Sequence, residues 1–221
     1  MSKFTLILLK LVLGINSYTY RLAGSLAQKA EKDGVHPKHR IMKYHSFFLD
    51  NLGSGDSVLD IGCGNGELAY DVALKAKSVT AIDIDGKKIA AAKARYPAGN
   101  IRYLHGDALK DLPDEKFDVI ILSNVLEHIR DRVEFLAGIK GKAGRLLIRV
   151  PMIDRSWIDV YKKELGLEYR LDPTHYIEYT FEGFEKEIGD AGLKVAGHSV
   201  QFGVIWAVVV DKTASEVRKV C

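Results

Sequence analysis

Two scarcities limit what this chain can be: it has few cysteines and no long uninterrupted apolar run. Its 221 residues include two cysteines, Cys63 and Cys221. Neither is placed for a structural disulfide, and no spacing typical of metal ligands occurs, so the sequence implies no metal. This cysteine usage fits a reducing, cytoplasmic environment. The most apolar stretch, residues 4–15, carries Lys10 and is shorter than the ~20 residues of a membrane-spanning helix.

The charge is also modest, which argues against some partners. A formal net charge of +3 is too small to indicate nucleic-acid binding by itself. An apolar fraction of 47% and a charged fraction of 28% are typical of a soluble globular protein. The length fits one well-buried α/β domain with a small appendage.

The N-terminal segment, residues 1–52, differs from the rest. Residues 1–50 hold eight Lys and Arg against three Asp and Glu, a net charge of +5. Apolar residues within 4–15 recur at helical spacing, and we expect a helical cap that breaks at Asp33-Gly34, not an independent domain. Two fates for the apolar face stay open. It packs on the protein's own body or on a second subunit of a homodimer, which is the commoner outcome, or it contacts a membrane peripherally.

From residue 53 to 221 we expect one domain in which strands and helices alternate. Apolar runs predict strands at 57–61, 78–83, 101–104, 117–122 and 144–150, and helices at 66–76, 86–95 and about 128–140. Residues 151–178 fit no simple crossover helix and are expected to form a substrate cap. A helix capped by Thr180 then precedes strands at 193–199 and 202–210. The pattern predicts an α/β, doubly wound, mostly parallel sheet whose last two strands are antiparallel.

The most informative motif is VLDIGCGNGE, Val58 to Glu67, in which an apolar strand closed by Asp60 runs into Gly62, Gly64 and Gly66. Alternate glycines let the backbone turn tightly and approach a ligand that a Cβ would exclude. The dinucleotide fingerprint Gly-x-Gly-x-x-Gly has one residue more before its third glycine. By itself the motif is also compatible with a glycine-rich turn in any α/β protein.

Three further cues occur in order along the chain. Asp83 ends the second strand, twenty-one residues after Gly62, where a carboxylate accepts hydrogen bonds from ribose hydroxyls. The third strand is closed by His105-Gly106-Asp107-Ala108, and the fourth runs into Ser123-Asn124-Val125-Leu126-Glu127-His128. With these cues, residues 56–210 resemble the class I S-adenosylmethionine-dependent methyltransferases.

The resemblance implies a Rossmann-like sheet of seven strands with one reversed strand near its edge. It also implies S-adenosyl-L-methionine as the cofactor and assigns its contacts. The glycine loop, with Cys63 inside it, wraps the methionyl part; Asp83 holds the ribose and Ile84 lies beside the adenine. Asp107 and Ala108 contact the adenine amino group, and Ser123 and Asn124 lie near the transferred methyl. For Asp107, a turn carboxylate is the structural alternative, and Asp85 is expected to cap a helix.

One more cofactor contact is implied before the core. The segment from His36 to His45 resembles a helix of related enzymes in which an arginine closes over the cofactor carboxylate. Arg40 would supply a bidentate fork to that carboxylate, with Tyr44 one helical turn further on the same face. A solvated basic helix face is the alternative, and the sequence does not decide between them.

Two histidines are the candidates for catalysis. Methyl transfer from a sulfonium needs a general base only when the acceptor is a hydroxyl or a protonated amine. His128 comes shortly after the fourth strand, and an imidazole suits proton removal near neutral pH. His175, within Asp172-Pro173-Thr174-His175-Tyr176, is the second candidate, and a structural histidine is the alternative for both. Glu127 and His128 would point about 100° apart on a helix, a poor metal site.

The residues directly after the fourth strand narrow the choice of acceptor. Ser-Asn-Val-Leu stands where adenine and cytosine amino methyltransferases carry Asn/Asp-Pro-Pro-aromatic, and protein-arginine enzymes place two glutamates where this chain has Glu127. No RNA-binding appendage is recognisable in the sequence. We therefore expect O- or N-methylation of a small molecule, with a sugar or polysaccharide precursor as one candidate.

Two other functions compete with this interpretation. A non-catalytic partner protein that binds S-adenosylmethionine is compatible with the same motifs. An NAD-dependent oxidoreductase or epimerase would show the longer glycine spacing and a Tyr-x-x-x-Lys pair, which residues 152–163 do not contain.

Overall fold

The computed structural model describes residues 2–32 and 36–213. The chain divides into two compact units. The smaller, here called the N-terminal unit, comprises Met1–Tyr44 and Ser156–Tyr169. The larger, the sheet unit, comprises His45–Arg155 and Arg170–Cys221. Cys221 and the expected break at Asp33-Gly34 lie outside the described residues.

The N-terminal unit contains three helices: α1 (Lys3–Ala30), α2 (Lys38–Met42) and α7 (Trp157–Glu164). Helix α1 has 28 residues, so it continues well beyond the apolar stretch that predicts it. Within the unit, Lys162 of α7 is buried and its Nζ lies 3.5 Å from Oδ1 of Asn16 on α1. In the ranges that the structure covers, no helix combines the length and apolar character needed to cross a membrane.

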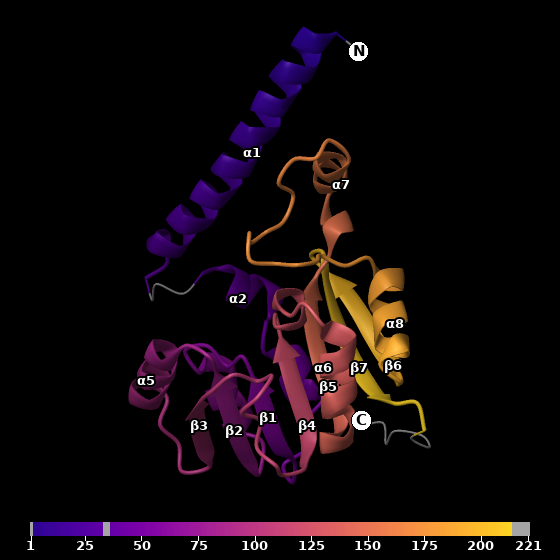
Figure 1. Cartoon of the computed structure of the whole chain (residues 1–221). Coiled ribbons are helices and arrows are strands. Elements are labelled where there is room, and N and C mark those ends of the chain that lie inside the picture. Colours follow the sequence, from indigo (N-terminus) through magenta and orange to yellow (C-terminus); the bar gives the residue numbers. More distant parts are fainter. Residues whose placement is uncertain (1, 33–35, 214–221) are drawn as a thin grey trace. The chain divides into compact units, whose positions relative to one another are not determined.

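The sheet unit is built on seven strands, which Figure 1 shows side by side. Their order among the described residues is β3-β2-β1-β4-β5-β7-β6. The bounds are β1 Ser57–Ile61, β2 Ser78–Asp83, β3 Ile101–His105, β4 Phe117–Ser123, β5 Ala143–Pro151, β6 Leu193–Gln201 and β7 Val204–Asp211. Strand β7 is antiparallel to both β5 and β6, and the other pairs are parallel. The predicted fold class is confirmed.

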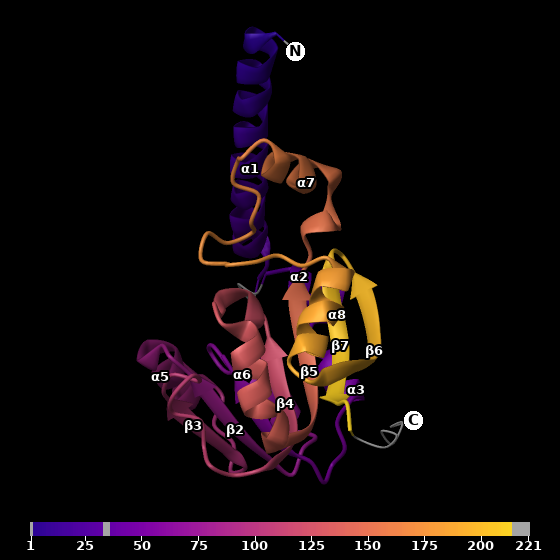
Figure 2. The same ribbon diagram turned by 45° about the vertical axis from the view of Figure 1, so that its right-hand side comes forward.

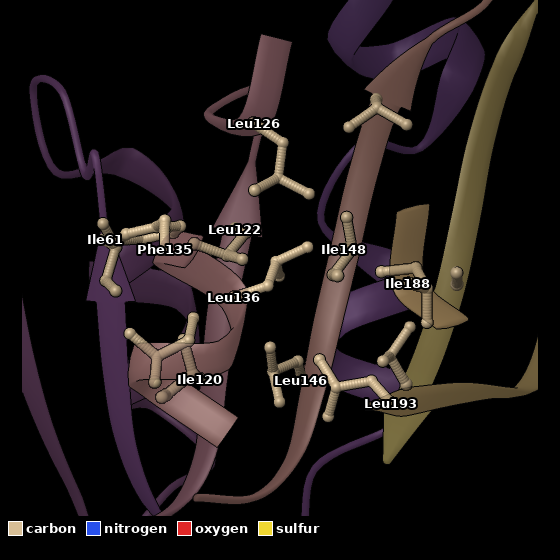
Figure 3. Packing of buried hydrophobic residues seen from close by; sticks show 14 of the residues in the cluster. Ile61, Ile120, Leu122, Leu126, Phe135, Leu136, Leu146, Ile148, Ile188 and Leu193 are labelled. Carbon is tan, nitrogen blue, oxygen red and sulfur yellow. The ribbon is translucent and has the colours of Figure 1, made fainter. Parts of the chain in front are cut away.

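Strands β1, β2, β4 and β5 are mostly buried because helices cover the sheet. Helices α6 (Arg132–Ile139) and α8 (Phe181–Asp190) pack against one face of the sheet (Figure 2). Their side chains join those of β1, β4 and β5 in one core (Figure 3). The labelled members include Ile120 and Leu122 from β4, Leu136 from α6, and Ile188 from α8.

The remaining helices of this unit are short: α3 Ser46–Asp50, α4 Glu67–Ala73 and α5 Gly86–Arg95, with 3-10 turns η1 Leu126–His128, η2 Lys140–Lys142 and η3 Ile153–Arg155. Two predicted caps are present. The Asp85 side chain accepts hydrogen bonds from the backbone N–H groups of Lys87 and Lys88, and the Thr180 hydroxyl accepts one from Gly183. Both helices therefore begin where the capping residues place them.

Two local predictions differ from the structure. The helix expected from about residue 128 begins at Arg132, because Ile129 takes an extended conformation (φ −99°, ψ 134°) after the 3-10 turn η1. The expected cap at 151–178 is divided between the two units. Its first part contains helix α7, which the sequence pattern does not predict and which begins where the Ser156 hydroxyl accepts a bond from Ile158 N–H.

Candidate cofactor and acceptor site

The glycine turn lies at the carboxyl end of β1, where all three glycines have a left-handed backbone. Their φ angles are 73° at Gly62, 56° at Gly64 and 88° at Gly66. A Cβ on Gly62 would lie 2.7 Å from Val125 Cγ2, and one on Gly66 would lie 2.8 Å from Ala92 Cβ. A Cβ on Gly64 would meet no described atom within 4 Å. Packing thus requires glycine at two positions, and the third faces open space that a ligand can use.

Asp83 connects the glycine turn to the end of β2. Its Oδ2 accepts a hydrogen bond of 2.8 Å from Gly64 N–H, and its Oδ1 accepts one of 2.8 Å from Asp85 N–H. Each oxygen has a further lone pair for a ligand hydroxyl. The neighbouring Ile84 is 69% exposed, as expected of an apolar side chain that a flat ring would cover. The ribose and adenine contacts of these two residues stay predictions.

Two side chains at the glycine turn have acid–base properties that the motif alone does not indicate. Asp60 is 1% exposed, and its Oδ2 has no hydrogen-bond partner in the described part of the chain. The pKa of Asp60 is raised to about 8, mainly by burial and to a smaller extent by the negative charge of Asp83. Cys63 is also buried, and burial raises the pKa of its thiol. The surroundings of the turn therefore favour a cation near Asp60 and do not favour a thiolate.

In the loop after β3, Asp107 has the hydrogen bonds of a turn carboxylate, which is the structural alternative to a role in adenine binding. Its Oδ1 accepts a hydrogen bond of 2.9 Å from Leu109 N–H, while its own N–H donates to Asp111. Oδ2 lies 3.6 Å from the exposed Lys110 ammonium, which leaves it accessible. The adenine contact of Asp107 and Ala108 stays a prediction.

The segment after β4 lies against the glycine turn, as the Gly62–Val125 approach shows. Asn124 has φ +59°, which is uncommon for a residue with a side chain. Its Nδ2 donates a hydrogen bond of 2.7 Å to Glu127 Oε1. Ser123 Oγ accepts a long bond of 3.5 Å from Arg149 Nη1. The strained turn at Asn124 thus directs the chain from the glycine turn toward Glu127 and His128.

His128 and His175, which the sequence offers as alternatives, lie together. Their ring centroids are 4.7 Å apart and the rings are nearly perpendicular. Glu127 joins them: one ligand atom from each of the three side chains lies within 4.8 Å of the others. Glu127 and His128 lie on a 3-10 turn and not on the expected α-helix, and their ligand atoms lie within 4.8 Å of each other although the sequence predicts a poor metal site.

Burial changes the acid–base properties of this cluster. It raises the pKa of Glu127 to about 7. It lowers the pKa of His128, and the nearby His175 lowers it further. Near neutral pH, His128 is therefore held in its neutral form, able to accept a proton.

Arg40 belongs to the N-terminal unit, so its predicted contact with the cofactor stays a prediction. Its guanidinium is 73% exposed and lies 3.3 Å from Oε1 of Glu31. Tyr44 lies in the same unit with its ring 4.8 Å from that of His39. The arginine thus takes part in an exposed ion pair, which costs little to break.

Comparison with known proteins identifies one domain of the chain. A family model described as a methyltransferase domain matches residues 59–142, from β1 to the end of η2. An uncharacterized methyltransferase of Mycobacterium tuberculosis is 39% identical over 85 residues, 38% of this chain and 43% of that protein. Residues 59–142 therefore form a methyltransferase domain.

Other relatives agree with this assignment. The mitochondrial ubiquinone biosynthesis O-methyltransferase of Schizosaccharomyces pombe is 35% identical over 106 residues, 44% of this chain and 39% of that protein. The methyltransferase domain thus spans less than half the length of these curated relatives.

Solved structures show the same fold at lower identity. Magnesium protoporphyrin IX methyltransferase from Synechocystis PCC 6803, with bound SAH, has a TM-score of 0.60 at 21% identity, with 79% of this chain and 83% of that chain covered. An N-methyltransferase from Bradyrhizobium japonicum WM9, in complex with S-adenosyl-l-homocysteine, has a TM-score of 0.59 at 17% identity, with 89% and 99% covered.

A similar curated protein is named a probable S-adenosylmethionine-dependent methyltransferase, and S-adenosyl-L-methionine is the cofactor that the sequence predicts. The residues present fit it. The space beside Gly64 admits a ligand against the backbone. The unpartnered Asp60 oxygen suits a molecule that carries an ammonium and a sulfonium, because an opposite charge stabilises a buried carboxylate. Sequence reasoning gave Asp60 no role in binding, although this residue closes the first strand of the motif.

Proposed function

We propose that this chain transfers a methyl group from S-adenosylmethionine to a hydroxyl of a small-molecule acceptor. The observation that carries the proposal is the cluster of Glu127, His128 and His175, on the segment after Val125, which contacts the glycine turn. A hydroxyl must lose its proton as the methyl arrives, and a side chain that takes it accelerates the reaction. The curated relatives named as ubiquinone biosynthesis O-methyltransferases also support an oxygen acceptor.

The division of roles follows from the site. When bound, S-adenosylmethionine supplies a methyl on a sulfonium; the acceptor oxygen's lone pair forms the new bond and the carbon–sulfur pair stays with sulfur. The glycine turn, Asp60 and Asp83 hold and orient this cofactor, which is much of the catalysis in an in-line displacement. His128 and His175, held against Glu127, promote loss of the acceptor's proton.

For the acceptor, we propose a sugar or a related polar ring. The ring of Tyr176, next to His175 in the sheet unit and 53% exposed, supports this class, because aromatic faces bind the apolar faces of such rings. An N-methylated acceptor is the second candidate and would show less dependence on a base.

We also propose a cytoplasmic protein whose helix α1 contacts an anionic lipid surface. The helix, Lys3–Ala30, has no acidic residue and four basic ones, Lys3, Lys10, Arg21 and Lys29. Its exposed apolar side chains include Phe4, Ile7, Leu8, Leu11, Val12 and Ile15. Basic and apolar side chains on one helix are typical of interfacial binding. A homodimer that covers the same face is the alternative outcome.

The proposed reaction is tested by incubating the protein with methyl-labelled S-adenosylmethionine and fractionated small metabolites of a lysate. We expect label in one acceptor fraction, and loss of that label with Asp83→Ala. Protein that binds the cofactor but labels no fraction would instead support the non-catalytic alternative. Cation exchange of the labelled product at acidic pH then separates a methylated amine, which is retained as a cation, from a neutral methyl ether.

A further inference from the structure

The cluster of Glu127, His128 and His175 has the composition and rigidity of a metal site. The histidines are 47 positions apart in the sequence, yet one ligand atom from each of the three side chains lies within 4.8 Å of the others. A backbone hydrogen bond of 2.7 Å from Tyr176 N–H to the Glu127 carbonyl joins the two segments beside the cluster. The three side chains are thus held together by the main chain and not by flexible loops alone.

An unpartnered buried atom points to a missing cation. Glu127 is 0% exposed, and its Oε1 accepts a hydrogen bond from Asn124 Nδ2. Its other oxygen, Oε2, has no partner anywhere in residues 2–32 and 36–213. A buried carboxylate oxygen that contacts neither a donor nor a cation is strongly unfavourable. A metal ion between Glu127 and the two imidazoles would satisfy it.

Hydrogen bonds to Nδ1 determine which nitrogen of each histidine ring carries the proton. The Thr174 hydroxyl lies 2.8 Å from Asp172 Oδ1 and 3.0 Å from His128 Nδ1. Since a carboxylate accepts only, Thr174 donates to Asp172 and accepts from His128 Nδ1–H. His175 Nδ1 lies 3.3 Å from Glu178 Oε1, so it also donates. Both rings therefore keep the lone pair on Nε2, the arrangement in which outer carboxylates and hydroxyls hold ligating histidines.

We propose that Glu127, His128 and His175 bind one divalent transition-metal ion, with Zn²⁺ as the type case. Two imidazoles and one carboxylate favour such a metal over Mg²⁺ or Ca²⁺, which take oxygen ligands. Three protein ligands leave a position open, as in catalytic zinc sites. Because His128 is exposed, the open side is accessible from solvent.

The role of the ion rests on the proposed function. It would draw electron density from an acceptor hydroxyl and so ease loss of its proton to solvent. The three side chains would then act by holding the ion, and the reaction would gain a dependence on metal that a purely histidine-based mechanism lacks. Binding of the ion itself does not require the cofactor or the acceptor.

The test is titration of the chelator-treated full-length protein with Zn²⁺, and with Co²⁺ as a spectroscopic probe, in the absence of S-adenosylmethionine. We expect one equivalent of either metal, visible d–d absorption with Co²⁺, and a raised melting temperature. His128→Gln, Glu127→Gln and His175→Gln should each weaken binding at least about tenfold. His198→Gln, an exposed histidine on β6 outside the cluster, is the matched control and should bind as the wild type does.

Folding is checked separately, because Glu127 and His175 are buried and their variants risk instability. His128→Gln is the least disruptive change, and its unchanged affinity for S-adenosylmethionine would show that it is folded. No stoichiometric metal binding by wild type, or wild-type affinity in folded His128→Gln, would overturn the proposal. These outcomes leave methyl transfer untouched, whereas failure to methylate any acceptor with metal bound would contradict only the proposed function.

Discussion

Gly64 donates a hydrogen bond of 2.8 Å from its backbone N–H to Oδ2 of Asp83. This bond joins the glycine turn after β1 to the carboxylate that ends β2. The second oxygen of Asp83 accepts from Asp85 N–H, at the start of α5. A change at Asp83 should therefore affect both the ligand contact and the shape of the turn that receives the ligand.

Asp83→Ala should weaken S-adenosylmethionine binding by about 1–3 kcal/mol, since the ribose hydroxyls and Gly64 N–H lose a charged acceptor. Isothermal titration calorimetry measures this directly. Asp190→Ala, which removes an exposed carboxylate paired with Lys186, is the control and should leave affinity unchanged. An Asp83→Ala protein that is folded and retains wild-type affinity would show that the ribose lies elsewhere.

Substitutions at Gly66 and Gly64 should affect protein stability and cofactor affinity to different extents. Gly66→Ala places a Cβ 2.8 Å from Ala92 at φ +88°, so we expect a loss of at least about 2 kcal/mol in the free energy of unfolding. Gly64→Ala meets no described neighbour and should lose only about 1–2 kcal/mol of stability, from its φ of +56°, while cofactor affinity falls. Gly64→Val should lower that affinity further. Urea unfolding and calorimetry measure the two quantities.

Gly55→Ala, in the loop before β1, has free space around it and should alter neither quantity. Unchanged cofactor affinity in Gly64→Ala would show that no ligand approaches this part of the turn.

Asp60 should make the protein without cofactor less stable as the pH rises. Its folded pKa of about 8 exceeds the ordinary value of 3.8, so between these values the folded state holds a proton that the unfolded state has lost. The contribution of Asp60 to the free energy of unfolding is therefore largest at low pH and decreases as the pH rises to about 8. Asp60→Asn should remove that dependence, be more stable than wild type at pH 8, and bind S-adenosylmethionine more weakly.

Urea unfolding at pH 5 and pH 8 checks the Asp60 prediction. The difference in free energy of unfolding between variant and wild type should favour the variant more at pH 8. The same difference at both values would mean that Asp60 is ionised throughout and has a partner in the folded protein.

His128→Ala should reduce turnover by about 10²–10⁴-fold if the acceptor is a hydroxyl. Affinity for S-adenosylmethionine should change little, because His128 acts on the acceptor. Steady-state rates with the identified acceptor, alongside calorimetry, provide the measurement. Near-normal turnover in His128→Ala would make the histidine structural and would favour an acceptor that needs no base.

Helix α1 should bind anionic vesicles in a salt-dependent way. Leu8→Glu with Leu11→Glu should abolish co-sedimentation with phosphatidylserine-containing vesicles, because charge would enter the apolar layer. Leu74→Glu, an exposed leucine of the sheet unit, is the matched control. Wild-type protein that does not bind vesicles but elutes as a dimer, with the double variant monomeric, would favour the homodimer instead.

Much of the fold could be predicted because its causes are local. The five parallel strands from β1 to β5 coincide with apolar runs bounded by turn residues, and Asp85 and Thr180 cap helices through bonds two or three residues away. Helix α7 is not predicted from the sequence because its amphipathic pattern is short and lies among loop residues. The division of 151–178 depends on contacts with the distant α1, which no local pattern carries.

In the candidate site, too, the features that depend on local sequence are predictable and those that depend on distant contacts are not. The glycine turn and Asp83 have fixed spacing along the chain, so their relation is predictable. The approach of His175 to His128 depends on a backbone bond between Tyr176 and Glu127. The raised pKa of Asp60 comes from its complete burial under the turn, and a strand-closing aspartate does not by itself show that burial.

The most direct test of the whole account is calorimetric titration of the purified chain with S-adenosylmethionine, its demethylated product S-adenosylhomocysteine, and NAD. We predict saturable one-to-one binding of the first two, weakened by Asp83→Ala, and no heat of binding with NAD. Saturable NAD binding with no response to S-adenosylmethionine would contradict the account.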